Sequence, residues 1–246
     1  MTDENLYRVT PGKGHPSTWK VEHYASVGMS ELFIFRFAEE IPRILGASLI
    51  QGKERDKANQ SINLFLLEGL TPAFEHLRTI RKHAAEPPPL MNRKQAYEDF
   101  FRTLWHAYKD LFQSAIRGMG FDIGFLFRPD NEFEKEAKKS FDPEFVSFFR
   151  QQRADWQNDL KRVRNDYLEH RKLDWKDVKR FYRVEAAEKF FEGVWTTAEE
   201  IFIGLIESRF PPMCGIREIP VEKRDPNYPL RFGFVTSVPL PDEPTR

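Results

Sequence analysis

Apolar side chains recur every three or four residues through long segments of this chain. Between about Asp56 and His83 the repeat consists of Ile62, Leu66, Leu70, Ala73, Leu77 and Ile80. This spacing places the apolar side chains on one face of an α-helix, where they can be buried together. The three prolines that follow, residues 87–89, cannot continue a helix and should end it. The pattern therefore predicts long amphipathic helices.

The same pattern predicts four further helices. The first spans Val21 to about Gln51 and should be kinked or split by Pro42, and the third spans about Arg93 to Arg117 and ends at Gly118. The fourth opens at Asp142-Pro143-Glu144, with proline at its first position and acids near its positive end. The fifth is capped by Asp174 and stopped by Pro211-Pro212. Five helices joined by short breaks predict an all-α helical bundle.

Each of the last two helices carries an apolar face that we expect to be buried. In the fourth helix this face comprises Phe145, Phe149, Trp156, Leu160, Val163 and Tyr167. In the fifth it comprises Val178, Phe181, Phe190, Val194, Ala198, Ile201 and Leu205. Between the third and fourth helices, the stretch from Phe121 to about Ser140 reads as less regular.

The composition divides the chain into three segments. Residues 1–20 form a polar N-terminal extension that reads as an extended or mobile lead-in, because Pro11, Gly12, Gly14 and Pro16 interrupt it. Residues 21–210 form the helical bundle. Residues 211–246 form a tail with eight prolines, in which Ile216–Val221 and Leu230–Val235 could pair as a small β-hairpin.

Charge and cysteine content exclude several classes of protein. Basic and acidic residues balance at 38 each, so a site for a polyanion must be local rather than a property of the whole surface. Cys214 is the only cysteine, which excludes an internal disulfide framework and a cysteine-based zinc cluster. The first residues do not form a secretory signal, and we see no segment apolar enough to span a bilayer. We therefore expect a cytoplasmic protein without a membrane anchor.

Several familiar cofactor sites lack the residues they require. Glu54 stands where a phosphate-binding loop needs Ser or Thr, and no glycine pattern for a dinucleotide follows a strand. Neither His-Glu-x-x-His nor paired Glu-x-x-His motifs occur, and His76 and His83 share a helix face without a third ligand. We therefore expect no metal and no cofactor.

One segment near the end of the fourth helix carries chemistry: Arg164-Asn165-Asp166-Tyr167-Leu168-Glu169-His170. It resembles the R-x(4-6)-H signature of the HEPN superfamily, in which a polar residue, often Asn, follows the Arg. The late position of the motif among the helices is also similar to that family. The resemblance implies a helical domain and a metal-independent ribonuclease site assembled across a dimer, although the superfamily also contains non-catalytic members.

The residue types in the motif suit RNA cleavage without reference to the family. An Arg guanidinium can hold two phosphate oxygens, and a His can transfer protons near neutral pH. We therefore assign Arg164 and His170 catalytic roles, with Asn165 hydrogen-bonding the ribose or phosphate. The ribose 2′-hydroxyl would be the nucleophile. Arg162, Arg171 and Lys172 are our candidates for binding substrate.

The spacing of the motif limits what a single helix can do. Six residues put Arg164 and His170 about 120° apart around a continuous α-helix, so the two side chains do not converge unaided. Either the helix breaks near Arg164, or a second subunit supplies another Arg-His pair, which predicts a symmetric homodimer. Asp166, four residues before His170, could orient the imidazole. The basic residues nearby outnumber the acidic ones and include Lys161, Lys176, Lys179, Arg180 and Arg183.

Other interpretations stay open. The motif can instead be a solvated basic helix end in which Arg164 pairs with neighbouring Asp or Glu residues, or the chain can be a scaffold whose Pro-rich tail docks elsewhere. Arg78 and His83 also satisfy the spacing, but Thr79 follows that Arg and the pair lies in the second helix. In the alternative to an enzyme, the chain is a non-catalytic helical module that binds nucleotide, RNA or a protein partner. As an endoribonuclease it would be a toxin or defence effector acting on RNA, restrained by an antitoxin protein.

Overall fold

The computed structural model describes residues 6–10, 20–24, 45, 48–140, 143–170, 175–207, 214–218 and 232–236. The chain divides into two units, one formed by residues 60–201 and the other by residues 1–59 together with residues 202–246. The first unit is built from helices, and all of the described strands lie in the second.

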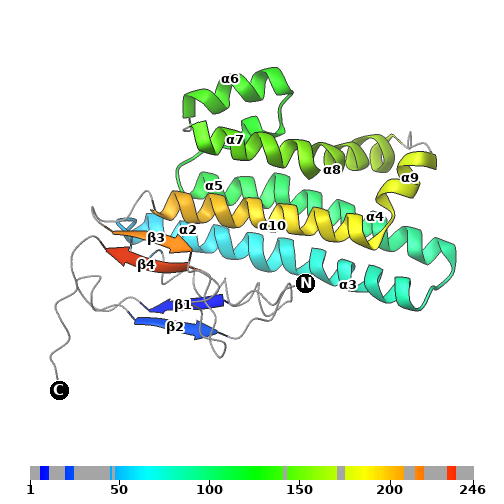
Figure 1. Cartoon of the computed structure of the whole chain (residues 1–246), viewed down its shortest axis with the longest axis horizontal. Helices are drawn as coiled ribbons and strands as arrows, with labels where there is room; N and C mark the ends of the chain where they lie inside the picture. Colours follow the sequence, from blue (N-terminus) through cyan, green and yellow to red (C-terminus); the bar gives the residue numbers. More distant parts are fainter. Residues whose placement is uncertain are drawn as a thin grey trace. The chain divides into compact units, whose positions relative to one another are not determined.

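Four long helices make up most of the described chain, and the predicted all-α helical bundle is confirmed (Figure 1). The first long helix, which corresponds to the second predicted helix, runs through α2 (Gly52–Leu64), η2 (Phe65–Leu70) and α3 (Thr71–Ala85). The second long helix, which corresponds to the third predicted helix, runs through α4 (Leu90–His106), η3 (Ala107–Phe112) and α5 (Gln113–Gly118). The third runs through α7 (Pro143–Gln152), η5 (Arg153–Gln157), α8 (Asn158–Arg162) and η6 (Val163–Glu169). The fourth is α10 (Val184–Glu207). Segments η2, η3, η5 and η6 are π-helical stretches within otherwise α-helical runs.

The boundaries set by proline and glycine fall where the sequence predicts them. The first long helix ends before residues 87–89, the second ends at Gly118, and the third begins at Pro143. Phe149, Trp156, Leu160 and Val163 of the predicted apolar face are buried. The side chains of Phe145 and Tyr167 lie outside the described residues.

Two predictions about the helices are wrong. The predicted fifth helix is two helices, α9 (Trp175–Phe181) and α10, separated by a bend at Tyr182 and Arg183. Tyr182 packs against Tyr97 and Phe101 of α4, with ring centroids 5.1 Å and 5.7 Å apart, and this contact holds the corner in place. The stretch predicted to be less regular contains η4 (Gly124–Phe127), a 3-10 turn, and the helix α6 (Asp130–Ser140).

The predicted helix from Val21 is also wrong at both described ends. Strand β2 (Lys20–Tyr24) pairs antiparallel with β1 (Leu6–Thr10), placing Leu6 opposite Tyr24. Ser48–Gln51 is not helical, and residues 25–44 lie outside the described residues. Paired apolar side chains stabilise strands, and the partner of β2 lies in the segment expected to be only a lead-in.

The C-terminal strands form a second two-stranded sheet. Strand β3 (Cys214–Glu218) pairs antiparallel with β4 (Phe232–Thr236), with Ile216 opposite Phe234. These strands overlap the predicted hairpin but are displaced by about two residues. Each described helix lacks an apolar stretch long enough to cross a membrane.

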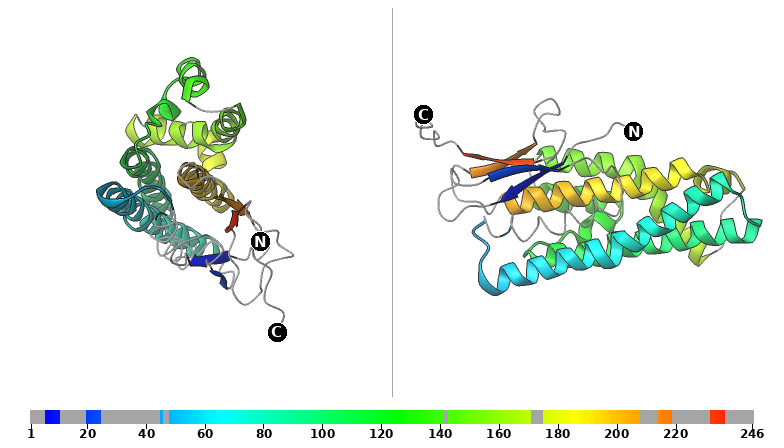
Figure 2. Two further views of the ribbon diagram at one scale, coloured as in Figure 1. Left: turned by 90° about the vertical axis from the view of Figure 1, so that its left-hand side faces the viewer. Right: turned by 90° about the horizontal axis from the view of Figure 1, so that it is seen from below.

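Within the unit of residues 60–201, α10 packs against the three other long helices, as two further views indicate (Figure 2). Phe191 contacts Phe74 of α3, with ring centroids 5.5 Å apart, and Phe190 contacts Phe101 of α4 at 5.9 Å. The indole of Trp156, from the third helix, lies directly over Gly193. The apolar face of α10 is therefore the centre of the core.

The close approach at Gly193 yields a stability prediction. A Cβ at this position would lie 2.6 Å from three atoms of the Trp156 ring. The ring is buried and its Nε1 donates to Gln152 Oε1 at 2.8 Å, so it cannot easily move away. Overpacking costs about 1–3 kcal/mol, which outweighs the gain of about 1 kcal/mol from alanine's helix propensity. We expect Gly193→Ala to lower the free energy of unfolding, measured by urea denaturation.

The matched control for this prediction is the same change in a Trp156→Ala background. There the clash is removed, so Gly193→Ala should be neutral or stabilising. Equal losses in both backgrounds would show that the contact with Trp156 does not require glycine.

A row of polar side chains on the third helix fixes the irregular stretch that precedes α6. The buried Arg153 donates from Nη1 to the carbonyl of Leu126 at 2.5 Å, and from Nη2 to the carbonyl of Arg128 at 3.0 Å and to Asp130 Oδ1 at 2.5 Å. Its guanidinium also lies 4.6 Å from the centre of the Phe133 ring.

Two more side chains extend this row along the same face. Gln157 donates from Nε2 to Leu126 O at 2.6 Å, and Lys161 donates from Nζ to Phe127 O at 3.1 Å. Gln157 also accepts a hydrogen bond from Tyr108, whose pKa is raised by burial. Residues four apart lie on one face of a helix, so Arg153, Gln157 and Lys161 act together on η4. This row orients the helix that ends in the Arg164–His170 segment.

Candidate functional site

The candidate motif lies on η6, at the C-terminal end of the third long helix, which corresponds to the fourth helix predicted from the sequence. Leu160 and Val163 are buried there and anchor the turn, and η6 packs against α4. Arg164 and Asn165 are partly exposed, and His170 is exposed immediately after the last helical residue. The three predicted catalytic side chains therefore belong to one accessible stretch of the helix.

This stretch is a π turn rather than an α turn. The backbone N–H of His170 donates to the carbonyl of Asn165, five residues earlier, at 3.2 Å. The helix continues through Glu169, so the break near Arg164 that would bring His170 into a new helix does not occur. Of the two arrangements that the spacing allows, the one using a second subunit stays a prediction.

The guanidinium of Arg164 is held by two neighbours in the motif. Its Nη1 donates to Asn165 Oδ1 at 3.0 Å, and its Nη2 lies 2.6 Å from Glu169 Oε1. About one third of the Arg164 side chain is exposed, at 32%, against 44% for Glu169. The guanidinium is therefore accessible to solvent but already bound to a carboxylate.

Asp166, proposed to orient His170, contacts a different partner. Its Oδ2 lies 3.9 Å from Arg162 Nε, at the ordinary α-helical spacing of four residues. Among the described side chains, Asp166 makes no hydrogen bond or ion pair with His170. Both Arg162 and Asp166 are about half exposed, so the orienting role stays a prediction.

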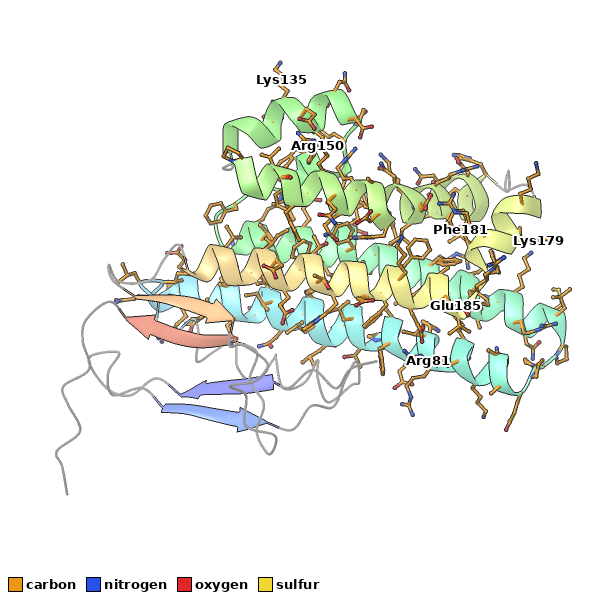
Figure 3. All side chains as sticks on the ribbon, in the orientation of Figure 1. Arg81, Lys135, Arg150, Lys179, Phe181 and Glu185 are labelled. Atoms are coloured by element: carbon orange, nitrogen blue, oxygen red, sulfur yellow. The ribbon has the colours of Figure 1, made fainter. Side chains whose placement is uncertain are left out.

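Two of the basic residues around the motif already have partners. Arg180 on α9 pairs with Asp159 at 2.5 Å, and Lys161 is committed to the carbonyl of Phe127. Lys176 and Lys179 are exposed on α9. Figure 3 labels Lys179 on the outer side of α9 and the buried Phe181 on the side that faces the neighbouring helices. The predicted substrate-binding residues Arg171 and Lys172 lie outside the described residues.

The chain matches no model of a known protein family, and neither a curated protein nor a solved structure was found to be significantly similar to it. The candidate site therefore rests on its own residues and their geometry. Among the side chains that the structure describes, no three His, Cys, Asp or Glu lie together as a metal ion would require.

The competing Arg-His pair is in a different setting. Arg78 and His83 lie on α3, and Arg78 Nη1 is 3.1 Å from Glu75 Oε1, one helical turn before it. This segment is α-helical throughout, without the π turn that shapes Arg164–His170. Arg78 and His83 therefore serve as a matched control for the candidate site.

The sequence left open a pairing of Arg164 with an acidic neighbour but did not single out Glu169 as a member of the site. In an α-helix, residues five apart are separated by about 140° around the axis, so Glu169 would not be expected to touch Arg164. Only the π turn brings the two side chains together. The spacing alone contains no signal for this pairing.

Proposed function

We propose that this chain is an HEPN-like endoribonuclease that cleaves RNA without a metal ion. The observation that carries the proposal is the placement of Arg164, Asn165 and His170 on one accessible π turn at the end of a helix that is anchored by buried contacts. A flexible RNA strand could reach all three side chains there. The resemblance of the motif supports the same reading.

The chemistry needs only these side chains and the RNA itself. The 2′-hydroxyl oxygen attacks the adjacent phosphorus while a base removes the hydroxyl proton, and the bond from phosphorus to the 5′-oxygen breaks as that oxygen gains a proton. His170 can transfer protons near neutral pH, and Arg164 stabilises the charge that develops on the phosphate. Asn165 hydrogen-bonds the ribose or phosphate, while Arg162, Arg171 and Lys172 bind neighbouring phosphates.

A symmetric homodimer is part of the proposal. One His170 cannot be both base and acid in a single cleavage event without an intervening proton transfer. In a dimer whose two-fold axis passes beside η6, the second subunit would supply a second Arg164 and a second His170 to the same phosphate. In this arrangement the separation of the two side chains around one helix no longer prevents them from acting together.

The test is incubation of the purified chain with total RNA, with and without EDTA. We expect cleavage in both cases, and products with a 2′,3′-cyclic phosphate and a 5′-hydroxyl, because the attacking group is the neighbouring 2′-hydroxyl. Analysis of the product ends by enzymatic end-labelling and chromatography checks this result. Strict dependence on magnesium, or 3′-hydroxyl products, would contradict the mechanism.

A second candidate is favoured by the pairing of Arg164 with Glu169. If this pair persists, the turn could bind nucleotide, RNA or a protein partner without cleaving RNA. The ribonuclease hypothesis predicts that expression of the chain arrests growth, as expected of a toxin or defence effector that an antitoxin protein normally holds inactive. The non-catalytic module predicts RNA binding without cleavage and without growth arrest.

A further inference from the structure

The ion pair between Arg164 and Glu169 depends on the local backbone. The two residues are five apart, and the bond from His170 N–H to Asn165 O shows that the backbone here closes over five residues. If the turn were α-helical, the two side chains would point about 140° apart. The π turn therefore creates a contact that the sequence would not otherwise allow.

The carboxylate of Glu169 occupies a guanidinium that a phosphate would need. Carboxylate and phosphate oxygens accept hydrogen bonds from the same face of an Arg side chain. Glu169 Oε1 lies 2.6 Å from Arg164 Nη2, and Asn165 Oδ1 accepts from Nη1 at 3.0 Å. A phosphate that binds both terminal nitrogens of Arg164 therefore competes with these two acceptors for the same guanidinium charge.

We propose that Glu169 is an internal competitor of substrate phosphate that sets the affinity of Arg164 for RNA. The inference rests on the proposed function, in which Arg164 binds the phosphate that is cleaved. Glu169 is 44% exposed, so its carboxylate can move into water when a phosphate replaces it. Removing this negative charge should strengthen phosphate binding, whereas a purely structural ion pair would leave it unchanged.

The neighbouring acid does not have the same role. Asp166 faces Arg162 across 3.9 Å, a distance too long for a strong direct hydrogen bond, and the pair uses ordinary α-helical spacing. Of the two acids, Glu169 is the one whose removal should most change phosphate binding by the motif.

The experiment uses the full-length chain with inorganic phosphate as the probe. Phosphate is titrated while NMR follows the Nε–H signal of Arg164, assigned by its loss in Arg164→Ala. Exposed ion pairs contribute modestly, so Glu169→Gln should lower the phosphate dissociation constant about twofold to fivefold. The matched control is Asp155→Asn, an exposed acid on the same helix that loses the same charge but lies outside the motif.

The outcomes separate this inference from the proposed function. Equal phosphate affinity in Glu169→Gln and Asp155→Asn, or no response of Arg164 to phosphate in any form, would overturn the role of Glu169. RNA cleavage is measured in parallel on the same samples. If wild type does not cleave RNA while Glu169→Gln still binds phosphate more tightly than the control, the competitor role stands and the ribonuclease proposal fails.

A change in folding is detected independently. Helical circular dichroism should be the same in wild type, Glu169→Gln and Asp155→Asn. Glu169→Ala provides a second substitution with the same expected gain in phosphate affinity. Agreement between the two variants at position 169 shows that the carboxylate, and not the new side chain, is responsible.

Discussion

Replacing His170 with alanine should lower RNA cleavage at least ~100-fold while leaving the helical circular dichroism unchanged. Positioned general acids and bases contribute at least this much to proton transfer, and His170 is the only His in the motif. The side chain is exposed at the end of η6, so its removal leaves no cavity in the core. Initial rates of cleavage of a labelled RNA measure the effect.

Three further variants test the assignment within the same assay. Arg164→Ala should lower cleavage to a similar degree, because it removes the charge that stabilises the phosphate. Asn165→Ala should lower it less, since a neutral hydrogen bond contributes less than a charged one. His83→Ala, in the competing pair on α3, should leave the rate unchanged. Full activity in all of the motif variants would end the ribonuclease proposal.

Arg153→Met should lower the free energy of unfolding by about 3 kcal/mol, from the loss of charge-assisted hydrogen bonds in the interior. Methionine keeps most of the apolar volume but cannot donate to the carbonyls of Leu126 and Arg128, which accept at 2.5 Å and 3.0 Å. The carbonyl of Leu126 retains its hydrogen bond from Gln157, so the carbonyl of Arg128 is the backbone group that loses the hydrogen bond donated by Arg153. Urea unfolding followed at 222 nm measures the loss.

Arg150→Met is the matched control, because it removes the same charge from the same helix. The side chain of Arg150 is 54% exposed and pairs with Glu134 of α6 through Nε at 2.7 Å and Nη2 at 2.9 Å; Arg150 is labelled in Figure 3. Water replaces both partners of an exposed pair, so this substitution should cost much less than Arg153→Met. Equal losses of unfolding free energy in the two variants would show that the buried hydrogen bonds of Arg153 contribute no more to stability than the exposed pair of Arg150.

Local sequence signals predicted the features that depend on neighbouring residues alone. Pro143 starts a helix because its fixed backbone angle suits the first turn, and residues 87–89 end one because proline cannot donate the next hydrogen bond. The faces containing Trp156 and Phe190 were predicted to be buried because helical periodicity gathers them on one side. The residues of the candidate motif were likewise visible as types and spacing.

Other features depend on partners far away in the chain, and only the tertiary structure decided them. β2 is a strand because it pairs with Leu6–Thr10, and the bend at Tyr182 is held by Tyr97 and Phe101. Arg153 can be buried because the carbonyl of Leu126 in η4 and that of Arg128 just after η4 accept hydrogen bonds from it.

The environment of the motif was decided in the same way. By itself the sequence determined that Arg164, Asn165 and His170 lie near the end of one amphipathic helix. The folded backbone determined that this end closes as a π turn, and so placed Glu169 on the guanidinium of Arg164. The physical reason is that side-chain direction follows the hydrogen-bond register of the helix: one added residue per turn moves a carboxylate from the far side of the axis to the near side.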